Sequence, residues 1–475
     1  MTIKTSFVVS LLFAASALAG CGDLPSNVPL TSNSMLPDPF TFLNGTAVTT
    51  AADFTCRQAE ISALFQRFEL GDLPPRPESV VGTLSGNTLI INVSHGGRSI
   101  SFNVGIQKPA GAGPFPALIV FGGFLSLPQP SGVAILSFNN DDIAAQNNGQ
   151  SRGQGKFFTL YGVNHSAGAM MAWAWGVARI MDALEQVNAN INLKRVGVTG
   201  CSRNGKGALV AGAFEPRIAL TIPQESGSGG AGCWRISDSM LASGISTQTA
   251  SEIVQENVWF STAFNSFAQS GVSPLPFDHH MLSALIAPRP LLVIDNTGID
   301  WLGPESVWGC QKTANLVWQG LGVGDFMGVS QVGNHAHCSF PSQEQPDLNA
   351  FVNRFLKDQS ANTNIIKTDG ANGLGFVDSK WINWNMYTSP HFSSLPSTSI
   401  INGRSSSAIE KVSTTIYIPF CMPPRCNTRR FGAKSITCAK LMKSSIKSPH
   451  IVNFFKRSKE IGDTGLTKAR SKDPP

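Results

Sequence analysis

The sequence predicts an α/β fold, in which helices cover both faces of a mostly parallel sheet. Between residues 115 and 380, short apolar runs alternate with helix-like segments, which is typical of parallel strands joined by helices. One of these runs ends in a glycine-rich turn, and a helix-like segment follows at once. We expect a single domain over residues 20–396, because a chain of this length does not require more.

The N-terminal segment has the features of a secretory signal peptide. Lys4 precedes an apolar run from Phe7 to Leu18, and small residues occupy the exit of that run. The run is too short to span a bilayer comfortably, and no other run is long and apolar enough. We therefore expect residues 1–19 to be removed and the mature protein to be secreted and extracellular, with no membrane partner.

In a secreted protein, cysteines such as the nine in this chain are expected to form disulfides, because disulfides persist in oxidising compartments. An even six of them fall within the first 340 residues, which suggests three disulfide bonds: Cys21, Cys56, Cys201, Cys233, Cys310 and Cys338. Asn-x-Ser/Thr tripeptides predict N-glycosylation at Asn44, Asn92 and Asn164.

The elements of the predicted sheet can be taken in chain order. Alternating apolar and polar residues at 88–104 predict an antiparallel hairpin that leads into the sheet. Apolar runs predict strands at 116–121, 195–199, 219–223, 290–295 and 328–332. Helical patterns predict helices at 168–187, 205–213, 279–287 and 345–356.

The last part of the chain, residues 397–475, differs in composition. From Thr398 onward fifteen Lys and Arg stand against four Asp and Glu, so the tail carries +11 and the rest of the chain −5. We predict a disordered tail, or a misassigned gene end, over a cellulose-binding module, because the tail has one tyrosine and no tryptophan. The main body has no basic stripe interleaved with aromatics, so we expect no nucleic-acid partner.

The glycine-rich turn carries a candidate nucleophile. Ser202 lies two residues after Gly200, at the end of a predicted strand, and Gly205 opens a predicted helix. A strand, sharp turn and helix in this order are typical of the nucleophile elbow of the α/β-hydrolase fold, a three-layer αβα sandwich. The usual spacing is Gly-x-Ser-x-Gly, whereas here the second glycine comes one position later. A serine in such a turn can also be a plain turn residue.

A serine nucleophile needs a base, which an acid orients. The loop after the last predicted strand offers two histidines, His335 and His337. Two carboxylates, Glu225 and Asp295, follow predicted strands, and Asp295 holds the more usual position. The residues themselves leave both choices open. No cluster of His, Asp and Glu has metal-ligand spacing, so we expect no metal and no other cofactor.

Taken together, these motifs resemble carbohydrate esterase family 15, the glucuronoyl esterases. The specific elbow Gly-Cys-Ser-Arg-Asn-Gly-Lys is joined, in the family's order, by further matching segments over most of residues 21–390. These segments are 161–175, 200–208, 223–227, 300–304 and 335–338.

The resemblance implies a role for individual residues. It implies Ser202 as nucleophile, His337 as base and Glu225, in place of Asp295, as acid. Further residues that it implies are Arg203 at the oxyanion, and Lys206, Gln248, Glu256 and Trp301 as sugar contacts. It also implies the disulfide pairs Cys21 with Cys56, Cys201 with Cys338, and Cys233 with Cys310, and it has no counterpart for the tail.

The implied activity is that of a secreted serine esterase acting on the ester between 4-O-methyl-glucuronate of glucuronoxylan and lignin alcohols. We expect the enzyme to act as a monomer. The first alternative is another carbohydrate serine esterase, such as an acetyl xylan esterase. The second is a non-catalytic wall-binding protein, against which the complete set of serine, histidine and glutamate argues.

Overall fold

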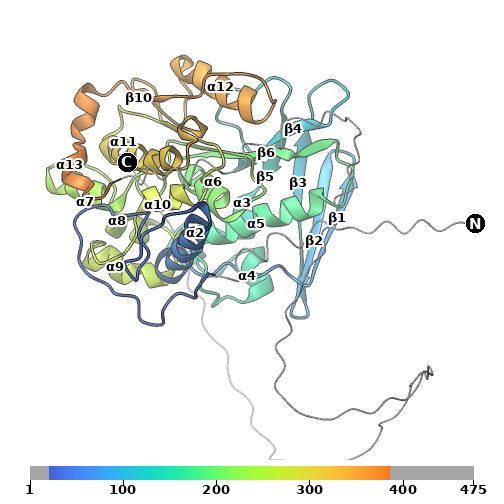
Figure 1. Cartoon of the computed structure of the whole chain (residues 1–475). Helices are drawn as coiled ribbons and strands as arrows, with labels where there is room; N and C mark the ends of the chain where they lie inside the picture. The colour runs from blue at the N-terminus through green and yellow to red at the C-terminus, as the bar shows by residue number, and fades with distance from the viewer. Residues whose placement is uncertain (1–20, 386–475) are drawn as a thin grey trace, which may run out of the picture. The chain divides into compact units, whose positions relative to one another are not determined.

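The structure is a computed structural model that describes residues 21–385, and the predicted signal peptide and the residues after 396 lie outside this range. The described residues form a ten-stranded sheet in the order β1-β2-β3-β5-β4-β6-β7-β8-β9-β10, with helices on both faces (Figure 1). The predicted α/β architecture with a mostly parallel sheet is confirmed. The predicted domain limits stay predictions.

Three antiparallel strands at one edge lead into seven parallel strands. Each of the pairs β1/β2, β2/β3 and β3/β5 is antiparallel, and from β5 to β10 all neighbours run parallel. The strands are β1 (Ser79–Ser85), β2 (Thr88–His95), β3 (Arg98–Gln107), β4 (Phe115–Phe121), β5 (Ala134–Phe138), β6 (Ile191–Cys201), β7 (Leu220–Gln224), β8 (Leu291–Asp295), β9 (Met327–Gln331) and β10 (Ile366–Thr368).

The helices come mostly from the connections between these strands. The α-helices are α2 (Ala51–Phe65), α3 (Asn140–Ile143), α4 (Lys156–Tyr161), α5 (Ala169–Leu184), α6 (Arg203–Phe214), α7 (Trp234–Ala242), α8 (Ala250–Glu256), α9 (Asn265–Ser270), α10 (His279–Ala284), α11 (Pro304–Gly320), α12 (Gln345–Phe355) and α13 (Asp378–Trp381). Short 3-10 and π helices are η1 (Gln66–Leu70), η2 (Gly149–Ser151), η3 (Thr262–Phe264), η4 (Asp300–Leu302), η5 (Gly324–Phe326), η6 (Ser342–Glu344) and η7 (Ala371–Gly375).

The predicted elements are found at their places. The five predicted strands correspond to β4, β6, β7, β8 and β9, and the four predicted helices to α5, α6, α10 and α12. The predicted hairpin is β2 and β3, which β1 extends to three antiparallel strands. The short strands β5 and β10 complete the sheet without having been predicted.

Side chains of alternating direction on the central strands build one core on each face of the sheet. On β4, Ile119 belongs to the larger cluster with α5 and α6, whereas its neighbours Leu118 and Val120 belong to a second cluster with α12. Adjacent residues of a strand point to opposite faces, so the two clusters lie on opposite sides of the sheet. The predicted three-layer arrangement follows, with α12 on one side and α5, α6 and α10 on the other (Figure 1).

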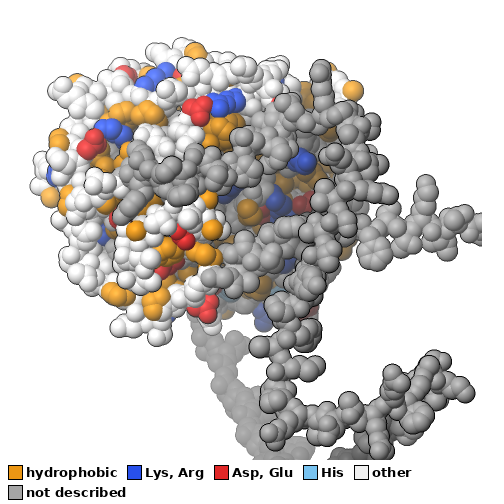
Figure 2. All heavy atoms as spheres, viewed as in Figure 1, with side chains coloured by type: hydrophobic (Ala, Val, Ile, Leu, Met, Phe, Trp, Pro, Cys, Tyr) orange, Lys and Arg blue, Asp and Glu red, His pale blue; other side chains and the backbone are white. Residues whose placement is uncertain are grey.

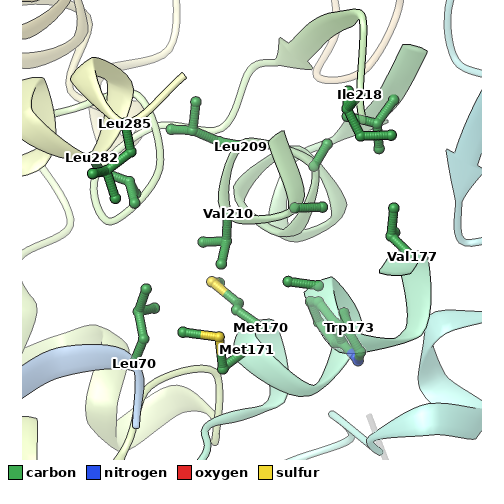
Figure 3. Packing of buried hydrophobic residues seen from close by; sticks show 14 of the residues in the cluster. Leu70, Met170, Met171, Trp173, Val177, Leu209, Val210, Ile218, Leu282 and Leu285 are labelled. Atoms are coloured by element: carbon green, nitrogen blue, oxygen red, sulfur yellow. The ribbon is translucent and has the colours of Figure 1, made fainter. Parts of the chain in front are cut away.

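Helix α6 is fixed within the larger core. Figure 3 shows Val210 of α6 next to Met170 of α5, and Leu209 of α6 on the side of Leu282 of α10; all four side chains are buried. Helix α5 is apolar almost all round, which is expected for a helix enclosed by other elements. The start of α6, which follows Ser202, is therefore held by packing on several sides.

All three implied disulfides are present: Cys21–Cys56, Cys201–Cys338 and Cys233–Cys310. Among the helices of residues 21–385, none is long and apolar enough to cross a membrane. On the face seen in Figure 2, charged side chains are few and scattered, and no basic stripe is visible there.

Candidate active site

The turn between β6 and α6 places Ser202 at the carboxyl edge of the parallel strands. Ser202 is half-buried and has φ 59° and ψ −129°, a conformation that costs free energy for any residue but glycine. The turn is so tight that a Cβ atom on Gly200 would lie 2.6 Å from the Asn204 carbonyl oxygen, and one on Gly205 2.6 Å from that of Gln224. The late second glycine thus has a steric reason.

Backbone hydrogen bonds fix the serine in this strained conformation. The Ser202 N–H donates to the Gln224 carbonyl oxygen at the end of β7 (3.0 Å), and the Ser202 carbonyl accepts from the Lys206 N–H (3.0 Å). Both hydrogen bonds use backbone atoms of Ser202, so neither involves its hydroxyl group. This is the arrangement that presents a nucleophile.

The structure brings His337 and Glu225 together. His337 Nδ1 lies 2.8 Å from Glu225 Oε2, and the same oxygen accepts the Cys338 N–H at 2.9 Å. Glu225 is fully buried, and its other oxygen accepts from the Gln224 amide at 3.2 Å. Because the carboxylate accepts a hydrogen bond from Nδ1–H, the imidazole carries its proton on Nδ1, and Nε2 is the nitrogen with a lone pair. Among the described residues, Nε2 has no hydrogen-bond partner.

A disulfide joins the nucleophile turn to the histidine loop. Cys201 directly precedes Ser202 and Cys338 directly follows His337, and their Cα atoms are 5.8 Å apart although 137 positions separate them in the chain. The bond limits how far the two catalytic candidates can separate.

His335 and Asp295, the alternative candidates for base and acid, have other contacts. His335 directs Nε2 toward the Val332 carbonyl oxygen of its own loop (2.8 Å) and Nδ1 toward the amide of Asn296, directly after β8 (3.2 Å). Asp295 is fully buried and accepts from the Gln331 amide (2.8 Å). Burial, together with the nearby charge of Glu225, raises the pKa of Asp295 to about 8. Asp295 thus keeps its proton at neutral pH.

Lys206 lies one helical turn after Ser202 and is buried. Its Nζ donates to the carbonyl oxygens of Ser226 (2.5 Å) and Ser228 (2.6 Å). Burial lowers the pKa of Lys206 to about 7, although the charge of Glu256 opposes this shift. An ammonium group has three donors, so the protonated side chain retains one for a bound molecule.

The remaining three sugar-contact candidates are connected to one another and to His337. The Gln248 amide donates to Glu256 Oε2 (3.1 Å), and the Gln248 N–H donates to the Trp301 carbonyl oxygen (3.1 Å). The Trp301 ring meets the His337 ring edge-on, with centroids 4.8 Å apart. Trp301 is 40% exposed, which leaves much of its ring open to a ligand.

Arg203 occupies the first position of α6. Its backbone N–H is among the first helical N–H groups, which have no acceptor within the helix. The exposed guanidinium lies 5.4 Å from the centre of the Trp259 ring, a cation–π distance. Both groups of Arg203 are thus available beside Ser202.

Two site residues were missed by the sequence analysis. Gln224 accepts the Ser202 N–H and donates to Glu225, and it could have been suspected only from its place before Glu225. Trp259 supports Arg203 across a separation of 56 positions, and no local pattern indicates such a contact.

One group of potential metal ligands lies at this site. Sulfur and nitrogen atoms of Cys201, His337 and Cys338 lie within 4.8 Å of one another. The two sulfurs are joined in a disulfide, so neither offers the thiolate that binds metal ions.

Comparison with known proteins finds relatives over most of the chain. A model of fungal glucuronyl esterases matches residues 91–322. A 4-O-methyl-glucuronoyl methylesterase from Hypocrea jecorina is 58% identical over 372 residues, which are 78% of this chain and 79% of that protein. One from Podospora anserina is 56% identical over 77% of this chain and 76% of its own length.

Solved structures agree with these matches. The glucuronoyl esterase catalytic domain from Hypocrea jecorina has a TM-score of 0.74 and covers 77% of this chain and 100% of its own. A glucuronoyl esterase from Sporotrichum thermophile was solved as a serine-to-alanine mutant in complex with methyl 4-O-methyl-β-D-glucopyranuronate. It has a TM-score of 0.73, is 50% identical, and covers 76% of this chain and 96% of its own.

Proposed function

The chain belongs to the fungal glucuronoyl esterases, and from this premise we propose that it hydrolyses the ester between 4-O-methyl-D-glucuronate of glucuronoxylan and an alcohol of lignin. The supporting observation is how three residues are connected. The Cys201–Cys338 disulfide joins the turn of Ser202 to the loop of His337, and His337 is hydrogen-bonded to Glu225. The enzyme is a carboxylic ester hydrolase that uses an acyl-enzyme on Ser202.

The reaction proceeds in two transfers at Ser202. In the first, the Oγ atom bonds to the uronoyl carbon while its proton passes to His337 Nε2. The bond from that carbon to the alcohol oxygen then breaks, and the alcohol leaves with the proton from His337. In the second, water attacks the acyl-enzyme by the same route and releases the uronic acid, which restores Ser202.

Charge develops at two places during each transfer. The carbonyl oxygen becomes negative. The N–H and guanidinium of Arg203, at the start of α6, can stabilise this negative charge. The imidazole becomes positive, and Glu225, buried against Nδ1, stabilises it and fixes the ring orientation.

Several polar side chains near the nucleophile recognise the sugar. Lys206, Gln248 and Glu256 supply donors and acceptors for hydroxyls, and the open face of Trp301 suits a sugar ring. A pocket of this kind discriminates between epimers, because the wrong hydroxyl leaves buried polar groups unpaired.

We further propose that the enzyme acts outside the cell. Three disulfides are typical of oxidising compartments. The asparagines of the three predicted glycosylation tripeptides, Asn44, Asn92 and Asn164, are all exposed and thus accessible to a transferase.

The proposed function is tested by comparing three substrates. These are the benzyl ester of glucuronic acid, the same ester of its epimer galacturonic acid, and an acetylated xylose. We expect the glucuronate ester to react fastest, and the epimer to be slower by about tenfold or more. Faster release of acetate would favour an acetyl esterase, and equal rates on the two epimers would refute uronate recognition.

A further inference from the structure

The loop after β4 presents a large apolar side chain to solvent at the edge that carries Ser202. Phe124 is 79% exposed, the largest exposed fraction among the large hydrophobic residues of the described part of the chain. The segment from Gly122 to Val133 contains no charged residue. An exposed aromatic ring in an uncharged segment offers an apolar contact to a bound molecule.

The loop is held in place on both sides of the ring. Before Phe124, the Gly122 N–H donates to Asn140 Oδ1 (2.7 Å). After it, the Ser126 hydroxyl donates to Gln224 Oε1 (2.6 Å), and Leu127 is buried. The exposure of Phe124 therefore does not result from a frayed segment.

The same contacts place the loop that carries Phe124 beside the nucleophile turn. Gln224, to which the Ser126 hydroxyl donates, also accepts the Ser202 N–H through its backbone carbonyl. Strand β4 pairs directly with β6, whose end carries Ser202. The Phe124 loop is thus the neighbour of the nucleophile turn.

The sugar-contact candidates on α6 and α8 and the loop that carries Phe124 pack against opposite faces of the sheet. Lys206 lies on α6, and the helix between Gln248 and Glu256 packs through Ile253 into the cluster on the α5 and α6 face. Leu125, next to Phe124, packs against the cluster on the α12 face, as does Phe340 of the histidine loop. An ester whose sugar half contacts α6 and α8 therefore has the loop of Phe124 on the other side of the serine.

We propose that Phe124, with Leu125 beside it, binds the aromatic ring of the alcohol half of the ester. This inference rests on the proposed function. With the uronate on the α6 face, the alcohol extends toward the α12 face. Phe124 offers an aromatic ring a stacking surface there, and no charge in its segment opposes the contact.

The experiment compares benzyl and methyl esters of 4-O-methyl-glucuronate, which share the acyl half. For each enzyme we take the ratio of kcat/KM on the benzyl ester to kcat/KM on the methyl ester. We expect Phe124→Ala and Phe124→Gln to lower this ratio by about three- to tenfold, the size of one aromatic contact. Phe124→Tyr keeps the ring and should keep the ratio.

Val81→Ala is the matched control, because Val81 is also exposed (48%) but lies on β1, which three strands separate from β4. It should leave the ratio unchanged. If both Phe124→Ala and Phe124→Gln leave the ratio unchanged and still cleave the methyl ester, the proposed role of Phe124 is wrong, whereas the proposed function stands. A wild-type enzyme that cleaves neither ester would overturn the proposed function and, with it, the proposed role of Phe124.

Discussion

Glu225 and Asp295 lie at the ends of adjacent strands, but different hydrogen-bond donors surround their carboxyl groups. Glu225 accepts hydrogen bonds from three directions: the His337 ring, the Cys338 N–H and the Gln224 amide. One Asp295 oxygen accepts from the Gln331 amide, and the other oxygen has no partner among the described residues. A buried carboxyl with so little support is more stable with its proton.

This difference predicts unequal effects of two isosteric substitutions. Glu225→Gln should lower kcat by about ten-thousandfold, the loss seen when a triad acid is replaced by its amide. Asp295→Asn should have a small effect at pH 6–7, because the carboxyl with its pKa of about 8 is already neutral there. The test is to measure kcat of both variants on the benzyl ester, with their thermal midpoints as a folding control. A larger loss for Asp295→Asn in a folded protein would show that the acid is misassigned.

Lys206 gives the site a dependence on pH. Below its pKa of about 7 the ammonium has a third donor for a sugar hydroxyl, and above it the amine's two donors are taken by the Ser226 and Ser228 carbonyls. KM for the glucuronate ester should therefore rise as pH increases through about 7. Lys206→Met should raise KM at pH 6 and remove this dependence.

Lys312→Met serves as a control for the loss of a lysine, because Lys312 is exposed and pairs with Asp378 away from the site. Its KM profile should match that of the wild type. A Lys206→Met enzyme with the wild-type profile would mean that Lys206 does not contact the sugar.

The sequence allowed the nucleophile to be proposed, but not its partners. Ser202 lies in a local pattern of glycines, and such a pattern is readable without knowing the fold. The acid and base meet across 112 positions, and their meeting depends on how loops leave β7 and β9. The choice of Glu225 over Asp295 required the family resemblance, because both follow apolar strands.

At the scale of elements, the site depends on the fixed relation between the turn after β6 and the loop after β9. Packing of α6 holds the first, and the Cys201–Cys338 bond connects the second to it. A displacement of about 1 Å between reacting groups can cost about a hundredfold in rate. The disulfide is thus expected to support turnover as well as stability.

Removing this bond tests that expectation. The double variant Cys201→Ala/Cys338→Ala should lower kcat by about ten- to a hundredfold at temperatures where it remains folded. Cys21→Ala/Cys56→Ala, which removes a disulfide that involves no site residue, should lower the thermal midpoint with little change in kcat. Equal kcat values for the two variants would mean that the Cys201–Cys338 bond is only structural.

The elements that were predicted share strong local signals, and those that were missed lack them. Strand β4 is a continuous apolar run, as expected when both faces are covered. Strand β10 has three residues, none of them buried, so nothing local distinguishes it from a loop. Strand β5 is apolar, but its place between β3 and β4 is a matter of topology that a short run does not reveal.

At the scale of the molecule, three hydrophobic clusters are built from residues between Val28 and Trp381 of the described range. The tail after residue 396 lies outside that range, and its composition offers little apolar periodicity for joining a core. A protein that ends at Pro396 should therefore match the full chain in thermal midpoint and in kcat/KM. A clearly lower midpoint for the shortened protein would show that the tail packs.

The central claim is that the whole molecule positions Ser202 to form an acyl-enzyme with a glucuronate ester. The most direct measurement is hydrolysis of the benzyl ester of glucuronic acid by Ser202→Ala, alongside its thermal midpoint. We predict a loss of kcat on the order of a millionfold, as for other triad serines, with an unchanged midpoint. Retention of more than a few per cent of wild-type activity by the folded variant would contradict the account.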